Sequence, residues 1–332
     1  MQLKIEDLLV ENKTTIFQHI LFLILQVIVV YFALTLGYEG KGVLSPDENG
    51  YSTWDFSQNL LYTLIASSLR SENIILGYLL NIVAFHVLLV LIRQMYGTKG
   101  VWYISPALVW LAGTYFSEIL FGLILALSLY FYKQNMYNLS IIFAFVSYFI
   151  RHIGLVAILV FALWFLYNGY RAGLIGIGVL GFIISISIFQ LDPSIANTAG
   201  YLDLMIFFSN PQWESFLVQT IFAFIYSGFF LIEWLFVIFV KRNKVSHIEY
   251  WLLWGFIILI GGYWIPQGLA GWTGSHFARR VAPVAILCFY KNEEGVADDL
   301  NELAAPRWLL FLRILSFALI VPIWVASYTN II

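Results

Sequence analysis

The most constraining feature of this chain is a series of about eleven apolar windows, each bounded by charged or turn-forming residues. A helix needs about 20 apolar residues to cross a bilayer. The chain has 332 residues, is 61% hydrophobic and 11% charged, and has a mean hydropathy of +0.86, whereas globular domains are about 25% charged. We therefore expect an all-α, polytopic transmembrane protein whose residues 1-332 form a single membrane domain. The windows lie at about 16-37, 74-95, 101-116, 117-132, 137-150, 152-170, 172-190, 216-240, 248-264, 276-290 and 308-328.

Window length, net charge and cysteine content further limit the helix arrangement, partners and cysteine-based sites that we expect. The third to sixth windows are short, so they predict either steep hairpins or helices that stop partway across the membrane and pack inside the protein. The net charge of −2 lacks the positive excess typical of nucleic-acid-binding proteins, so we expect no nucleic-acid partner. A single cysteine, Cys288, excludes an internal disulfide and a cysteine-based zinc cluster.

The distribution of Lys and Arg predicts the orientation of the chain in the membrane. With a cytoplasmic N-terminus, twelve of the 17 Lys and Arg residues fall on the inner face, in agreement with the positive-inside rule. No small-residue cleavage site follows the first apolar window, so we expect an uncleaved first helix. With about eleven spans, a cytoplasmic N-terminus predicts an outer C-terminus. We expect a multi-pass protein of a prokaryotic plasma membrane with its active site facing outside. The five outer cations are Lys41, Arg70, Arg151, Arg279 and Arg280.

Two outer loops, at about 38-73 and 191-215, are longer than the other connections. The first contains aromatic residues followed by an amphipathic stretch, which is suited to lying in the membrane interface. We expect an interfacial helix here that covers a cavity. Its apolar residues are Leu60, Leu61, Leu64, Ile65 and Leu69.

Two adjacent carboxylates, Asp47 and Glu48, lie in the first outer loop about ten residues after the first window. The stretch Pro46 to Tyr51 also contains glycine and ends in an aromatic residue. Paired acids near a low-dielectric environment can have separated pKa values, as acid/base chemistry and metal binding require. The alternative is a solvated turn.

Charged residues at the ends of two apolar windows predict further polar groups on the outer side. Glu118 follows Ser117 at the turn between the third and fourth windows, where a buried carboxylate costs too much to be idle. Arg151 and His152 lie between the fifth and sixth windows. An unpaired arginine there is costly, so Arg151 needs an anionic partner. The alternative for this pair is a contact between helices.

Two further arginines, Arg279 and Arg280, follow His276 at the outer end of the tenth window, against the positive-inside trend. Guanidinium groups suit a phosphate or pyrophosphate, because each offers two parallel hydrogen bonds and keeps its charge. Salt bridges to outer acids are the alternative. His86 lies in the middle of the second window, and for it we favour a structural contact with a neighbouring helix.

Taken in order, these stretches resemble the polytopic, lipid-phosphate-dependent glycosyltransferases of superfamily C, which include protein and glycolipid mannosyltransferases. The layout of nearly the whole chain is similar to theirs, but residue similarity is limited to four stretches. Pro46 to Tyr51 resembles the acidic pair of their first outer loop, and Tyr115 to Phe121 resembles an acid-containing hairpin that leads into a Leu-rich helix. Phe149 to Gly154 is similar to a turn with Arg and a later Gly, and His276 to Pro283 resembles a late Arg-containing stretch.

The resemblance implies a hexosyltransferase that moves a sugar from a polyprenyl-phosphate donor to a lipid, glycan or protein acceptor on the outer face. Asp47 would be the base that deprotonates the acceptor, and Arg279 or Arg280 would hold the departing lipid phosphate. Glu48 and Glu118 would position the acceptor or hold a divalent cation, Mg²⁺ or Mn²⁺, through hard oxygen ligands. Arg151 and His152 would supply a second phosphate contact, and inversion is expected from a single displacement.

Two other functions use the same residue types. A transporter or flippase for a lipid-linked sugar would line its pathway with ionisable groups at several depths and on both faces. A polysaccharide polymerase or ligase with a lipid-pyrophosphate donor would depend on arginine and histidine more than on the acidic pair. The concentration of acids and arginines on the outer face favours the glycosyltransferase.

Overall fold

A computed structural model of the chain describes residues 2–36, 60–96, 106–115, 117–190, 211–226 and 247–269. Isolated residues at 239, 283, 311–312, 314–316 and 318–319 are also described. Every regular element in these ranges is a helix, so the expected all-α class is confirmed for them. The acidic pair at 47-48, the arginine pair at 279-280 and the predicted window at 276-290, apart from Pro283, lie outside the described residues.

Two described helices are long and apolar enough to cross a membrane. They are α1 (Gln2–Leu36), whose apolar part is Thr15–Thr35, and α4 (Ile74–Tyr96), whose apolar part is Ile74–Met95. Helix α1 begins 14 residues before the predicted window, because its charged first turns continue the helix. Two helices alone do not establish about eleven membrane crossings, which stay a prediction.

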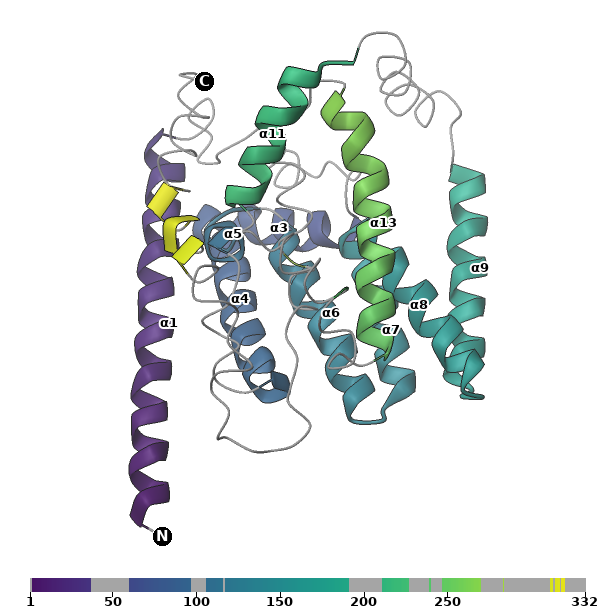
Figure 1. Cartoon of the computed structure of the whole chain (residues 1–332), viewed down its shortest axis with the longest axis horizontal. Coiled ribbons are helices and arrows are strands. Elements are labelled where there is room, and N and C mark those ends of the chain that lie inside the picture. The colour runs from purple at the N-terminus through teal and green to yellow at the C-terminus, as the bar shows by residue number, and fades with distance from the viewer. Residues whose placement is uncertain are drawn as a thin grey trace.

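Four consecutive helices form an antiparallel array beside α4 (Figure 1). They are α6 (Glu118–Lys133), α7 (Tyr137–Ile150), α8 (Leu155–Tyr167) and α9 (Ala172–Gln190), and their bounds agree closely with the predicted windows. Helices α6, α7 and α8 have 16, 14 and 13 residues, fewer than the 20 or so of a full crossing. The expected short helices are therefore present, and α6 is largely buried.

Two short turns, between α6 and α7 and between α8 and α9, allow these helices to pack side by side. The α6–α7 turn contains Asn135 with a φ of 60°, and the α8–α9 turn contains Gly169 with a φ of 74°. Helix α13 (His247–Leu269) packs against α8 and α11 (Trp213–Tyr226). Helix α6 also contacts α13 through an ion pair of 2.9 Å between Lys133 Nζ and Glu249 Oε1.

In the described part of the third predicted window, 106–115, there is a short helix, α5 (Pro106–Leu111), followed by a turn. The amphipathic stretch of the first outer loop forms α3 (Leu60–Glu72), which runs transverse to the upright helices across their upper ends (Figure 1). Its small and polar side chains face the protein, whereas Leu64 is exposed. A helix is thus present at the predicted position, with its polar side against the helix ends, and its place in a membrane interface stays a prediction. The buried residues of α3 are Tyr62, Thr63, Ala66 and Ser67.

The alternation of the helices agrees with the predicted sidedness. The N-terminal end of α1, the C-terminal ends of α4 and α6 and the N-terminal end of α9 lie on one side of the array (Figure 1). The sequence assigns Arg93, Lys133 and Arg171, which lie at or next to those ends, to the inner face. Glu118 and Arg151 are at the opposite ends. The cytoplasmic side of the array and the outer position of the C-terminus remain predictions.

Candidate functional site

Glu118 is the first residue of α6 and is completely buried. Its position in the first turn places the carboxylate at the positive end of the helix dipole, which stabilises a negative charge. Ser117 precedes it at the N-cap position, but the Ser117 hydroxyl does not cap the helix. The hydroxyl accepts a hydrogen bond from another element instead, so the N-terminus of α6 is built around a contact between helices.

That contact comes from Arg151, at the junction between α7 and α8. Arg151 has extended backbone angles (φ −150°, ψ 132°) and separates α7 from the short 3₁₀ helix η3 (His152–Gly154). Gly154 closes this turn against α7: a methyl group at Gly154 would lie 2.5 Å from Ser147 Oγ and 2.6 Å from the Tyr148 backbone nitrogen. Only glycine fits there, which explains why this turn needs a glycine three residues after the arginine.

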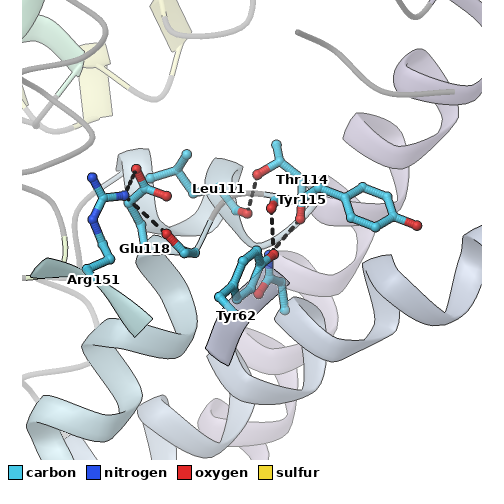
Figure 2. A network of polar contacts seen from close by, with 8 residues as sticks. Tyr62, Leu111, Thr114, Tyr115, Glu118 and Arg151 are labelled. Carbon is cyan, nitrogen blue, oxygen red and sulfur yellow. Dashed lines mark hydrogen bonds and ion pairs between the residues drawn. The ribbon is translucent and has the colours of Figure 1, made fainter. Parts of the chain in front are cut away.

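Arg151 and Glu118 form an ion pair through Arg151 Nη1 and Glu118 Oε1 (Figure 2). Nη1 also donates a hydrogen bond of 3.3 Å to Ser117 Oγ. The side chain of Glu118 is inaccessible, and that of Arg151 is 13% exposed. The expectation that Arg151 needs an anionic partner is confirmed, and Glu118 is not an idle surface residue.

The guanidinium of Arg151 keeps donors for a further ligand. Among the described residues, its polar contacts with Glu118 and Ser117 both go through Nη1. Nη2 and Nε can therefore form the parallel pair of hydrogen bonds that a phosphate or carboxylate accepts.

A polar network holds the turn that leads into Glu118. The Tyr62 hydroxyl donates to the Tyr115 carbonyl at 2.5 Å (Figure 2), and Asn81 Nδ2 donates to the Thr114 carbonyl at 2.7 Å and to the Tyr62 hydroxyl at 3.0 Å. The Thr114 hydroxyl donates to the Leu111 carbonyl at 2.6 Å. The three side chains of this network, those of Tyr62, Asn81 and Thr114, are buried. Sequence analysis did not single out Tyr62 or Asn81, although a carboxamide in the apolar window 74-95 was a detectable signal.

His152 does not share the position of Arg151. Its side chain is exposed, and its ring lies 5.5 Å from the Tyr148 ring, centroid to centroid. The two residues that sequence analysis grouped as one phosphate contact therefore differ: the ion pair with Glu118 involves Arg151, whereas His152 packs on α7.

Six predicted site residues lie outside the described residues: Asp47, Glu48, Tyr51, His276, Arg279 and Arg280. The expected convergence of Asp47 and Glu48 on Glu118 therefore stays a prediction. One residue of the late stretch is described: Pro283 is buried, and a methyl group at Gly122 would lie 3.3 Å from Pro283 Cβ. Gly122 is one helical turn after Glu118, so the end of this stretch packs beside the N-terminal part of α6.

The chemistry of the described residues bears on the expected divalent cation. The Glu118 carboxylate faces the Arg151 guanidinium, and a second cation on the same carboxylate would be repelled by it. No group of three or more His, Cys, Asp or Glu side chains that could hold a metal occurs in the described part of the chain. A Mg²⁺ or Mn²⁺ site formed by Asp47, Glu48 and Glu118 therefore stays a prediction.

A second polar contact lies between α1 and α4. Nδ1 of His86 is 2.7 Å from Nδ1 of His19, so the expected structural contact of His86 with a neighbouring helix is confirmed. Gln18 and Gln26 of α1 are buried as well, and among the described residues neither amide atom of Gln26 has a hydrogen-bond partner. None of these three α1 residues is among the predicted site residues, although glutamine and histidine in an apolar span were a detectable signal.

Comparison of the chain with protein family models, with curated proteins and with solved structures gives no match.

Proposed function

We propose that this protein is a multi-pass membrane glycosyltransferase that moves a hexose from a polyprenyl-phosphate donor to an acceptor on the outer face. The single observation that carries the proposal is the buried Glu118–Arg151 ion pair, at the ends of α6 and α7 that the sequence predicts to be outer. Only 11% of the residues are charged, so a buried guanidinium is uncommon in this chain. The Nε and Nη2 donors of Arg151 are not used by Glu118 or Ser117. A lipid phosphate at headgroup depth is the anion that such a group would meet in a membrane.

In this proposal Arg151 binds the donor phosphate and Glu118 orients Arg151. The Glu118 carboxylate and the Ser117 hydroxyl hold Nη1, which directs Nε and Nη2 toward a ligand. As the bond between the sugar and the phosphate breaks, negative charge grows on the phosphate, and a fixed guanidinium stabilises it. Glu118 thus acts through Arg151, rather than as the acceptor-positioning or metal-binding residue expected from the sequence.

The remaining roles in the proposal rest on the sequence. Asp47 accepts the proton of the acceptor hydroxyl as the oxygen attacks the anomeric carbon, and Glu48 assists it or shares a divalent cation with it. Arg279 and Arg280 precede Pro283 by four and three residues, so the chain keeps the Arg280 Cα within about 11 Å of the Pro283 Cα. Because Pro283 packs beside α6, a second guanidinium near the phosphate is consistent with the proposal.

The exposed apolar surface supports the multi-pass part of the proposal. Large apolar side chains of α1 such as Ile16, Phe17 and Val27 are more than half exposed, as expected of a helix that faces lipid. The helices α7, α8 and α9 also expose apolar residues, among them Ile142, Leu163 and Leu174. Such surface would be a liability in water and is favourable in a bilayer.

The test uses the full chain purified into lipid nanodiscs and a polyprenyl-phosphate hexose labelled in the sugar. Binding of this donor is measured first, and label transfer is then followed with membranes from cells that lack the protein as the source of acceptor. Arg151→Lys should weaken donor binding about tenfold because lysine lacks the parallel pair of donors. Arg171→Lys, at an exposed inner position, is the matched control. Absence of donor binding by the wild-type protein would refute the proposal.

A second candidate function, a transporter for a lipid-linked sugar, is favoured by the α1–α4 contact. His19, His86 and the buried Gln26 are polar groups within the two apolar spans, at depths other than that of Glu118. In liposomes, a transporter would carry a fluorescent polyprenyl-phosphate sugar across the bilayer without cleaving it, and His86→Leu would abolish this movement. Cleavage of the sugar from the lipid, with His86→Leu active, would decide for the glycosyltransferase.

A further inference from the structure

The turn that carries Ser117 and Glu118 is held from outside by two side chains of other helices. Tyr62 comes from the first turn of α3, and Asn81 comes from α4. We propose that Tyr62 and Asn81 are positioning residues, which fix the Glu118–Arg151 pair for the donor phosphate by holding the backbone carbonyls just before it. This inference rests on the proposed function for the identity of the ligand, but the positioning itself is independent of it.

The contacts are directed at the backbone rather than at side chains. Tyr62 donates to the carbonyl of Tyr115 at 2.5 Å, and Asn81 donates to the carbonyl of Thr114 at 2.7 Å. Tyr62 also accepts from Asn81 at 3.0 Å, so the two side chains orient each other. A backbone carbonyl buried away from water must be paired, and these two donors satisfy the carbonyls three and four residues before Glu118.

The side chain of Tyr115 anchors the same turn from the other direction. Its hydroxyl donates to the carbonyl of Ile74, and its ring lies 4.5 Å from the Tyr78 ring between centroids. Gly77 leaves the space for it, because a methyl group there would lie 2.2 Å from Tyr115 Cε1. The Arg70 guanidinium carbon lies 5.6 Å from the centre of the same ring. Residues of α3 and α4 therefore contact both the backbone of this turn and the side chain of Tyr115.

This arrangement links the candidate site to the first outer loop. Helix α3 follows the loop that contains Asp47 and Glu48, and Tyr62 is its third residue. The helix that holds the turn before Glu118 is therefore the one that continues from the segment with the predicted base. Apolar side chains in place of Tyr62 and Asn81 would leave both carbonyls unpaired at a desolvation cost, so these two donors fix the backbone of the turn.

The experiment compares Tyr62→Phe and Asn81→Leu with wild-type protein in nanodiscs. Tyr62→Phe removes one oxygen and keeps the ring. Tyr31→Phe is the matched control, because Tyr31 is 63% exposed on α1. Hydrogen–deuterium exchange is measured for the peptide 108-121, in which the amides of Ala112, Gly113 and Thr114 donate within the turn. Both variants should speed exchange in this peptide, and the peptide 172-190 of α9 should be unchanged.

The second readout is the affinity for polyprenyl phosphate without sugar. Each variant loses its own hydrogen bond to a backbone carbonyl and the hydrogen bond between Tyr62 and Asn81. We expect binding to weaken about five- to tenfold in each. The same substitutions are then made in an Arg151→Lys background, where a positioning residue that acts through Arg151 should have little further effect. A residue with only a general structural role would add its full effect in both backgrounds.

The outcomes separate the two hypotheses. Unchanged exchange in the 108-121 peptide, or fully additive effects on affinity, would overturn the positioning role. If the wild-type protein does not bind polyprenyl phosphate, the proposed function fails, whereas the exchange data still decide whether Tyr62 and Asn81 hold the turn. Gly77→Ala is a second variant that displaces the Tyr115 ring without touching either hydrogen-bonding side chain, and it should speed exchange in the same peptide.

Discussion

Glu118 and Lys133 lie at opposite ends of α6, and each forms an ion pair with a residue of another helix. Glu118 pairs with Arg151 at the α7–α8 junction, and Lys133 pairs with Glu249 in the first turn of α13. Their separation of 15 positions along the helix corresponds to about 22 Å. The two contacts are therefore too far apart to share a ligand, and their effects on stability and on donor binding are separable by mutation.

Removal of the Glu118 carboxylate should destabilise the protein strongly. Glu118→Ala leaves the Arg151 guanidinium largely buried without its anion, and loss of one partner of a buried pair costs about 3–5 kcal/mol. Glu118→Gln keeps the volume and an acceptor oxygen, so the cost should be smaller. Thermal unfolding in detergent measures both variants, with Glu214→Gln at an exposed position of α11 as the control. Equal unfolding temperatures for Glu118→Ala and wild type would contradict the burial of this pair.

At the C-terminal end of α6, Lys133→Met should lower stability and leave donor binding intact. The Glu249 side chain is 3% exposed and would lose its cation, whereas the Lys133 side chain is 28% exposed and partly hydrated. We therefore expect a loss of about 1–2 kcal/mol, less than for a fully buried pair. The measurements are the unfolding temperature and the affinity for a polyprenyl-phosphate hexose. A loss of affinity in folded Lys133→Met protein would mean that the donor site extends to this end of α6.

The helices that the sequence predicts best are those that end at charged or turn-forming residues. Glu118 and Lys133 delimit α6, and the turn around Asn135 separates it from α7, so the predicted windows 117-132 and 137-150 agree with the structure. The window 101-116 was predicted less well, because apolar composition does not distinguish a helix from a buried turn. The turn after α5 is stabilised by tertiary hydrogen bonds, which hydropathy does not report.

The charged residues of the candidate site were likewise predicted from the sequence, whereas its uncharged residues were not. The cost of an unpaired charge in an apolar environment predicts that Glu118 and Arg151 need partners, and the structure pairs them with each other. Neither Tyr62 nor Asn81 carries a charge, so their buried contacts depend on the fold and not on a local pattern. Convergence of Asp47 and Glu48 on this pair remains a prediction from the resemblance.

The close approach of Gly154 to α7 gives a third prediction. Gly154→Ala would place a methyl group against the backbone of Ser147 and Tyr148, and overpacking of this kind costs about 1–3 kcal/mol. The displaced turn should also weaken donor binding, because Arg151 belongs to it. Gly178→Ala is the matched control, since a methyl group there has nothing within 4 Å. It should be neutral or slightly stabilising. A stable Gly154→Ala variant with normal donor affinity would show that the turn tolerates a shift.

A fourth prediction concerns the proposed base. Asp47→Asn removes basicity with little change in volume, so transfer should fall about 10²- to 10⁴-fold, with donor affinity and unfolding temperature unchanged. Asp55→Asn, in the same outer loop, should retain transfer within twofold. The assay follows labelled sugar from the polyprenyl-phosphate donor to acceptor in membranes. Residual transfer by Asp47→Asn within twofold of wild type would reduce Asp47 to a turn residue.

The final prediction concerns Arg279 and Arg280, which the positive-inside rule disfavours on the outer side. At least one of them should contact the donor phosphate together with Arg151. Pro283, which follows them closely in the chain, packs against Gly122 of α6, one helical turn after Glu118. Arg→Lys should weaken donor binding while keeping the charge, since lysine provides a point charge instead of two parallel hydrogen bonds, and Arg→Ala should be worse.

If Arg280 and Arg151 hold the same phosphate, their substitutions should be non-additive. The double variant Arg151→Lys/Arg280→Lys would then bind a polyprenyl-phosphate hexose with an affinity that departs from the product of the single effects, because residues that share a partner are coupled. Arg171→Lys controls for the loss of an arginine at the other end of the helices. Normal donor affinity in both Arg279→Lys and Arg280→Lys, or loss of affinity that follows the unfolding temperature alone, would leave Arg151 as the phosphate ligand and assign the arginine pair to salt bridges with outer acids.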